Sequence, residues 1–110
     1  MSRSDKIYLQ DISESIEIII SYIGDKTAHD FIKDLMLQDA VTRRFEIIGE
    51  AASKISQQFK DDNPSIPWGL MKGMRNKLIH EYFGGSAETL YSTIQIDIPL
   101  LSAQLKSLNY

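Results

Sequence analysis

The feature that most constrains the fold of this chain is the spacing of its apolar residues, which recur every three or four positions along most of its length. That period places them on one side of an α-helix, in which successive residues turn by about 100°. The clearest stripe consists of Val41, Phe45, Ile48, Ala52, Ile55 and Phe59. Because the alternation typical of half-buried strands is nearly absent, we expect an all-α fold.

Capping residues, glycines and prolines indicate where the helices begin and end. Pro99 lies inside the apolar pattern of the last helix, where its ring and missing N–H predict a kink or a split. The connections between segments are short, which favours an up-and-down bundle of four main helices plus a short one. The expected helices are 4–23, closed by Gly24, a short one around 31–36, then 38–59, 68–83, and a last one capped by Ser86.

Length and composition narrow the possible functions. A chain of 110 residues is expected to form a single domain over 1–110. It contains no cysteine, which excludes disulfides, thiolate catalysis and zinc–thiolate sites. The longest apolar run, at 18–20, is too short to cross a bilayer, and no signal-peptide core follows Met1, so we expect a cytoplasmic protein. The net charge of −3 means that any nucleic-acid site must be local.

Such a local site is indicated by the segment 75–82, in which Arg75, His80 and Tyr82 are spaced R-x4-H-x-Y. Arginine offers a planar set of donors for phosphate, and histidine titrates near neutral pH. Asn76 and His80, four apart, are neighbours on one helix face. Between Trp68 and His80 there is no acidic residue, and the cations there are Lys72, Arg75 and Lys77.

One helix does not aim Arg75 and His80 at the same small group. Five residues apart, they point roughly 140° from each other. Either the flexible arginine curls around, or two copies of the helix meet and combine their residues. A symmetric dimer would achieve the second, since an isologous interface repeats the same patch on both sides. The geometry therefore favours a homodimer.

Each of these residues also has an ordinary structural explanation. Asn76 is compatible with a solvated helix position, and Tyr82 with a half-buried packing position. His80 would lie near the end of its helix, where the helix dipole favours an imidazolium. Arg75 could be an ion-pair partner on the surface, with Glu81 or Asp62 as its partner. Arg43 and Arg44 on the long helix could extend the basic patch, or could pair with acidic neighbours at 39 or 46.

Taken together, these residues resemble the signature of HEPN-domain proteins, and more narrowly that of the HepT-type toxins paired with a small nucleotidyltransferase antitoxin, MntA. The resemblance covers most of the chain and extends to the flanks of the motif. The further matching stretches are 37–41 with Arg44, Glu46, Gly49 and Glu50 on the long helix, then 66–68 and 97–99.

The resemblance implies a metal-independent endoribonuclease without a cofactor, acting as a homodimer whose two motifs face one cleft. A ribose 2′-hydroxyl would attack the adjacent phosphate, with His80 as general base or acid. Arg75 would stabilise the transition-state charge, and Asn76 would orient His80 or the phosphate. The absence of a carboxylate cluster at the motif agrees with chemistry that needs no metal. The basic residues expected to bind RNA are Lys72, Lys77, Arg43 and Arg44.

The resemblance also gives Tyr82 a second role, as the acceptor of AMP transferred by the antitoxin. An adenylate there would compete with RNA phosphate for the donors of Arg75. The sequence leaves undecided whether the toxin dimer forms a larger assembly with the antitoxin. An alternative from another class is a non-catalytic helical subunit that binds substrate for a nucleotidyltransferase or regulates it. Toxicity in cells that lack the antitoxin would favour the nuclease.

Overall fold

The computed structural model describes residues 1–77 and 86–108, and within these ranges the chain folds into helices without strands. The all-α class expected from the apolar spacing is confirmed. Two of the helices are short rather than one. In chain order the helices are α1 (Arg3–Ile23), α2 (Ala28–Lys33), α3 (Leu35–Lys54), α4 (Gln57–Asp62), α5 (Trp68–Lys77) and α6 (Ala87–Lys106).

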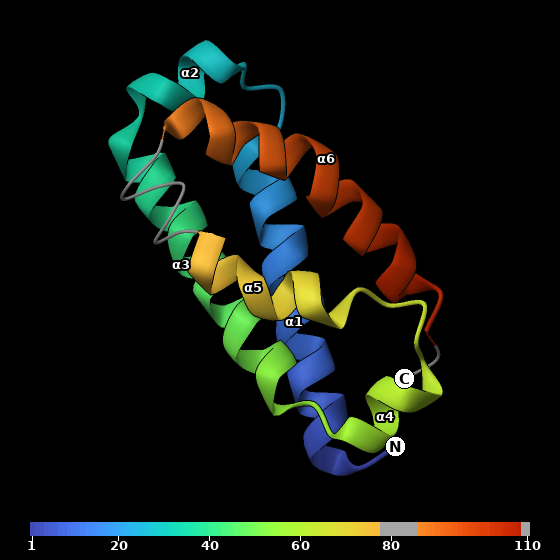
Figure 1. Cartoon of the computed structure of the whole chain (residues 1–110). Coiled ribbons are helices and arrows are strands. Elements are labelled where there is room, and N and C mark those ends of the chain that lie inside the picture. Colours follow the sequence, from blue (N-terminus) through green and yellow to red (C-terminus); the bar gives the residue numbers. More distant parts are fainter. Residues whose placement is uncertain (78–85, 109–110) are drawn as a thin grey trace.

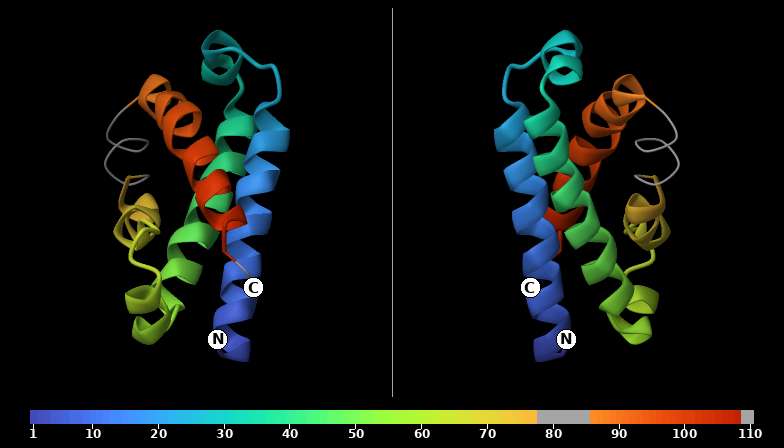
Figure 2. Two further views of the ribbon diagram at one scale, coloured as in Figure 1. Left: turned by 90° about the vertical axis from the view of Figure 1, so that its right-hand side faces the viewer. Right: turned by 90° about the vertical axis from the view of Figure 1, so that its left-hand side faces the viewer.

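The long helices α1 and α3 form the centre of the bundle (Figure 1). Figures 1 and 2 show α5 packed against α3, and α6 beginning beside α2 and running along α1 away from it. The core fills the space between these helices and includes the large side chains of Phe31 and Phe45, both fully buried. In the described part of the chain, no helix combines the length and apolarity needed to span a membrane.

Local signals determine the ends of α1, which agree with the prediction to within one residue. The hydroxyl of Ser2 caps the helix by accepting a hydrogen bond from the backbone N–H of Asp5 at 3.0 Å. Gly24 ends it with a φ of 50°, a backbone conformation that glycine adopts without strain. The apolar stripe of α1 is buried, namely Leu9, Ile12, Ile16, Ile19 and Ile23.

The predicted bounds of the second and third helices are wrong. Asp34 ends α2 and caps α3, accepting a hydrogen bond from the backbone N–H of Leu37 at 3.0 Å, so α3 begins three residues earlier than expected. At its other end α3 stops at Lys54, because Ile55 takes an extended conformation. Ser56 then caps the separate helix α4 through the backbone N–H of Phe59.

A buried carboxylate explains the break between α3 and α4. Asp5, only 4% exposed, accepts hydrogen bonds from the backbone N–H of Ser56 at 2.8 Å and from its hydroxyl at 2.6 Å. Burial raises the pKa of Asp5, but the hydrogen bonds from Ser56 and Ser2 outweigh burial, so the pKa is lowered from its ordinary value. Asp5 therefore ties the start of α1 to the α3–α4 junction.

The last helix continues through Pro99, so the predicted split does not occur. Pro99 lies on the exposed side of α6. The missing N–H of Pro99 and its ring therefore face away from the buried side of the helix. The opposite side of α6 is buried through Leu90, Ile94, Ile98, Leu101 and Leu105.

Candidate functional site

Helix α5 carries the first residues of the predicted site, and its position is determined by an aromatic anchor and two methionines. The indole N–H of Trp68 donates to the backbone carbonyl of Asn63 at 3.0 Å, and its ring packs edge-on against Phe59. Met71 and Met74 are fully buried against the core. Because these side chains define the inner face of α5, the polar residues of the helix point away from the core.

Helix α5 lies close to α3 at Gly49. A Cβ at this position would lie 3.3 Å from both the backbone N and the Cβ of Arg75, and 3.4 Å from the carbonyl oxygen of Lys72. Such distances are tighter than ordinary van der Waals contact, so only glycine permits this spacing without a shift of α5. Arg75 is thereby held where the two helices cross.

A pocket of about 180 Å³ lies beside this crossing. Its volume is well above the ~30 Å³ share of a single water molecule in the liquid. Roughly half of its lining comes from each helix, and three of the predicted site residues face it. The lining residues are Gly49, Glu50 and Ser53 of α3 and Lys72, Arg75 and Asn76 of α5.

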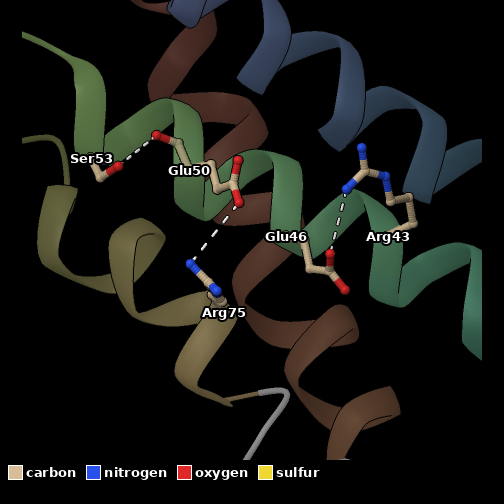
Figure 3. Close-up of polar contacts among 5 residues, drawn as sticks. All are labelled: Arg43, Glu46, Glu50, Ser53 and Arg75. Carbon is tan, nitrogen blue, oxygen red and sulfur yellow. Dashed lines mark hydrogen bonds and ion pairs between the residues drawn. The ribbon is translucent and has the colours of Figure 1, made fainter.

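Glu50 supplies the acid that the segment containing Arg75 lacks. Its Oε1 lies 4.0 Å from Nη1 of Arg75 (Figure 3). The two side chains are 54% and 62% exposed, so water screens the pair, and we place its contribution at about 0–1 kcal/mol. The guanidinium is held near the pocket by a contact that a better acceptor could replace. Sequence reasoning assigned Glu50 to the family resemblance but not to this contact.

The two arginines that were predicted together on the long helix have different surroundings. Arg43 is exposed and pairs with Glu46 at 3.4 Å (Figure 3). It precedes Glu50 by seven residues, which places it on nearly the same face of α3, about 10 Å further along the axis. Arg44 is turned by about 100° from Arg43 and is half-buried. Of the two, Arg43 is the one aligned with the pocket.

The remaining predicted residues fall outside what the structure describes. Lys77 is the last residue of α5, and its side chain is not among the described ones. His80 and Tyr82 lie in 78–85, also outside the described residues. The structure therefore brings Lys72, Arg75 and Asn76 together, while Arg43 lies outside the lining of the pocket and the roles of His80 and Tyr82 stay predictions.

An all-α bundle with a basic pocket at the start of an R-x4-H-x-Y motif defines the class as a HEPN-type helical domain. Comparison with known families agrees with this class. Residues 12–108 match the model of the family described as "Ribonuclease HepT-like". The chain belongs to this family.

Relatives with curated names extend over nearly the whole chain. It is 45% identical to "Probable ribonuclease HepT" of Thermococcus cleftensis, with 98% of each chain covered. It is 37% identical to a "Putative RNase" of Caldanaerobacter subterraneus, with 96% of this chain and 95% of the relative covered. A longer Methanocaldococcus jannaschii protein, "Gamma-glutamylcyclotransferase and putative RNase", is 43% identical over the matched region. That region covers 96% of this chain and 47% of the relative. No solved structure matches the chain.

Proposed function

We propose that this chain is the endoribonuclease toxin of a toxin–antitoxin pair, and that it cleaves RNA without a metal ion. The observation that carries the proposal is the pocket at the α3–α5 crossing, where Lys72, Arg75 and Asn76 converge in a chain of the HepT-like ribonuclease family. Cationic and amide donors are the groups that bind a phosphodiester. RNA is accordingly the proposed substrate.

The proposed reaction needs only groups of the protein and of the RNA. The ribose 2′-oxygen forms a bond to the adjacent phosphorus as its proton passes to a general base, and the bond from phosphorus to the 5′-oxygen breaks as that oxygen gains a proton. His80 acts as the base or the acid, because an imidazole exchanges protons near neutral pH. The products are a 2′,3′-cyclic phosphate and a 5′-hydroxyl.

In this scheme Arg75 stabilises the charge that develops on the phosphate oxygens. The phosphate displaces Glu50, whose contact with the guanidinium is long and exposed. Exchange of one acceptor for another costs little when the first contact contributes about 0–1 kcal/mol. Asn76 orients His80 or the phosphate from the same wall of the pocket.

The site is proposed to be composite, formed where two copies of the chain meet. Arg75 and His80 diverge by roughly 140° on one ideal helix, so two symmetric copies supply what one helix cannot. The RNA backbone is proposed to follow the cations Lys72, Lys77 and Arg43, with Arg44 more distant from the pocket. Each contact to a phosphate would contribute to a salt-dependent affinity.

Tyr82 is proposed as the site at which the toxin is silenced. A nucleotidyltransferase antitoxin would transfer AMP from ATP to its hydroxyl, forming a phosphodiester to the tyrosine oxygen and releasing pyrophosphate. The added phosphate would occupy the donors of Arg75. Incubation with such an enzyme and ATP should add one adenylate mass per chain. A Tyr82→Phe protein should stay unmodified and toxic.

Cleavage of a defined RNA by the purified protein tests the central proposal. We expect parent protein to cut in the presence of EDTA and to leave cyclic phosphate ends, and His80→Ala and Arg75→Ala to lose at least about a hundredfold in rate. Arg3→Ala is the matched control, because Arg3 is an exposed arginine at the start of α1. Equal rates for His80→Ala and the parent would refute the nuclease.

A second outcome would favour the alternative function. If none of these proteins cuts RNA, but the chain raises or lowers the activity of a nucleotidyltransferase and depends on Tyr82 for this, it is a non-catalytic regulatory subunit. Toxicity on expression without the antitoxin separates the two, since only the nuclease accounts for it.

A further inference from the structure

The outward face of α6 is apolar, although no element of the described structure covers it. Ile96 and Leu100 are 66% and 51% exposed, and Pro99 and Ala103 are exposed beside them. Spacings of three and four place these four residues on one stripe, directly opposite the side that packs into the core. A contiguous apolar patch on a protein surface is a candidate contact for another molecule.

Charges lie only at the ends of this stripe. Within 89–105 the one charged residue is Asp97, which is half-buried and turned about 100° from Ile96. Glu88 precedes the stripe and Lys106 follows it, and both are exposed. They are 18 positions apart, which is five whole turns of about 3.6 residues, so they lie on the same flank of α6.

We propose that the outward face of α6 binds the same face of a second copy of the chain, with the two helices antiparallel. In that arrangement a two-fold axis relates the copies, and Glu88 of each protomer lies opposite Lys106 of the other. The midpoint between Glu88 and Lys106 is residue 97, and the midpoint between Ile96 and Leu100 is residue 98. The charges and the two most exposed apolar side chains are thus centred within one residue of each other, and Pro99 and Ala103 extend the stripe towards Lys106, so a self-complementary pairing is possible.

A parallel pairing related by a two-fold axis would put the flank that carries Glu88 and Lys106 on opposite sides of the interface, so these charges would not pair. Attachment to a membrane surface is also a poor fit. Amphipathic helices that lie on membranes carry lysines and arginines along their polar face. On α6 the only such residue is Lys106 at its end, where it lies 3.5 Å from Glu17 of α1.

The size of the face determines how firmly two copies would hold together. A helix of 20 residues is about 30 Å long and 10–12 Å wide, so one face is well below the ~800 Å² per partner of a standard interface. Ile20 of α1, 39% exposed, borders the same face near Pro99 and adds some area. We therefore expect a reversible contact that forms as the protein concentration rises.

This contact is separate from the dimer proposed for cleavage, which is centred on the motif. The double variant Ile96→Asp/Leu100→Asp should remove one step of self-association in sedimentation over a concentration series. The matched control is Ile7→Asp, on α1, because Ile7 is 46% exposed and lies outside the stripe. Since all these positions are exposed, thermal unfolding should stay close to that of the parent.

Reversing the charges tests the antiparallel orientation. Glu88→Lys or Lys106→Glu alone should weaken the association by roughly tenfold, because two attractive contacts become repulsive in each dimer. The double reversal Glu88→Lys/Lys106→Glu should restore it when Glu17→Lys is added to all variants with glutamate at 106, because Lys106 also pairs with Glu17 of its own chain at 3.5 Å. A parallel pairing cannot give this pattern, since the flanks that carry these two residues would then lie on opposite sides of the interface.

Cross-linking provides an independent measurement, because the chain has no cysteine of its own. Ile96→Cys lies close to the proposed axis and should form a disulfide-linked dimer under mild oxidation, while Ile7→Cys should not. A parent protein that is monomeric at every concentration, or an aspartate double variant that associates as the parent does, overturns the proposal. The second result would point to a different protein as the occupant. RNA cleavage by the parent and by His80→Ala tests the nuclease proposal and does not depend on the α6 contact, so either proposal can fail while the other holds.

Discussion

Replacing Gly49 with alanine measures how tightly α5 is fixed against α3. The added methyl group would lie 3.3 Å from the backbone N of Arg75 and 3.4 Å from the carbonyl oxygen of Lys72. Neither backbone atom can turn aside as a flexible side chain would. To regain ordinary contact distance, α5 must move by a few tenths of an ångström and carry Arg75 with it.

Two opposing effects decide the stability of Gly49→Ala. Alanine favours the helical state over glycine by about 0.5–1 kcal/mol. Overpacking of a close contact costs about 1–3 kcal/mol. We therefore expect a net loss of unfolding free energy between zero and about 2.5 kcal/mol.

Gly73→Ala is the matched control, because Gly73 lies inside α5 and a Cβ there would meet no atom within 4 Å. It should gain the full helical preference of about 0.5–1 kcal/mol without a packing cost. Urea or thermal unfolding should therefore separate the two variants by about 1–3 kcal/mol, which corresponds to several degrees in Tm for a domain of this size. RNA cleavage should fall in Gly49→Ala and stay unchanged in Gly73→Ala.

Equal stabilisation of both variants would refute this reasoning, because it would mean that α5 yields at no cost. A Gly49→Ala protein that loses stability but cleaves RNA at the parent rate would refute the link between the helix crossing and the position of Arg75.

Three further predictions follow from particular contacts. Asp5→Asn should lose about 1–3 kcal/mol of unfolding free energy at pH 7, measured by urea titration. The hydrogen bonds from Ser56 lower the pKa of Asp5 below its ordinary 3.8. The stability difference between parent and variant should therefore be complete above pH 3.8 and vanish as the pH falls through the lowered pKa. Trp68→Phe loses the indole hydrogen bond, so the free energy of unfolding measured by thermal unfolding should fall by about 1–2 kcal/mol. Arg43→Ala should reduce the salt dependence of RNA binding, measured by fluorescence anisotropy, more than Arg44→Ala does.

The parts of the fold that the sequence predicts are those decided by neighbours along the chain. The bounds of α1 follow from the cap at Ser2, the positive φ of Gly24 and an unbroken apolar stripe, all of which are local. The break after Lys54 could not be predicted in this way. Ile55 continues the apolar pattern and is buried, but Ser56 is held by Asp5, 51 residues earlier in the chain.

The candidate site also has features that neighbours along the chain decide and features that only the packing of helices decides. The composition of α5 identifies Lys72, Arg75 and Asn76 as its polar face, and the structure places all three on one pocket. The stretch 68–80 contains no acidic residue, but the pocket does, because Glu50 enters from α3. Only the packing of two helices reveals that contact.

Two consecutive residues of α3 therefore govern the environment of Arg75. Gly49 allows the backbone of α5 to come close, and Glu50 then meets the guanidinium at the limit of ion-pair distance. A larger residue at 49 would move the arginine away from the carboxylate, and a neutral residue at 50 would remove the competitor for phosphate. Because the first change alters position and the second alters charge, their effects on RNA affinity should have opposite signs, although the two residues are adjacent in the chain.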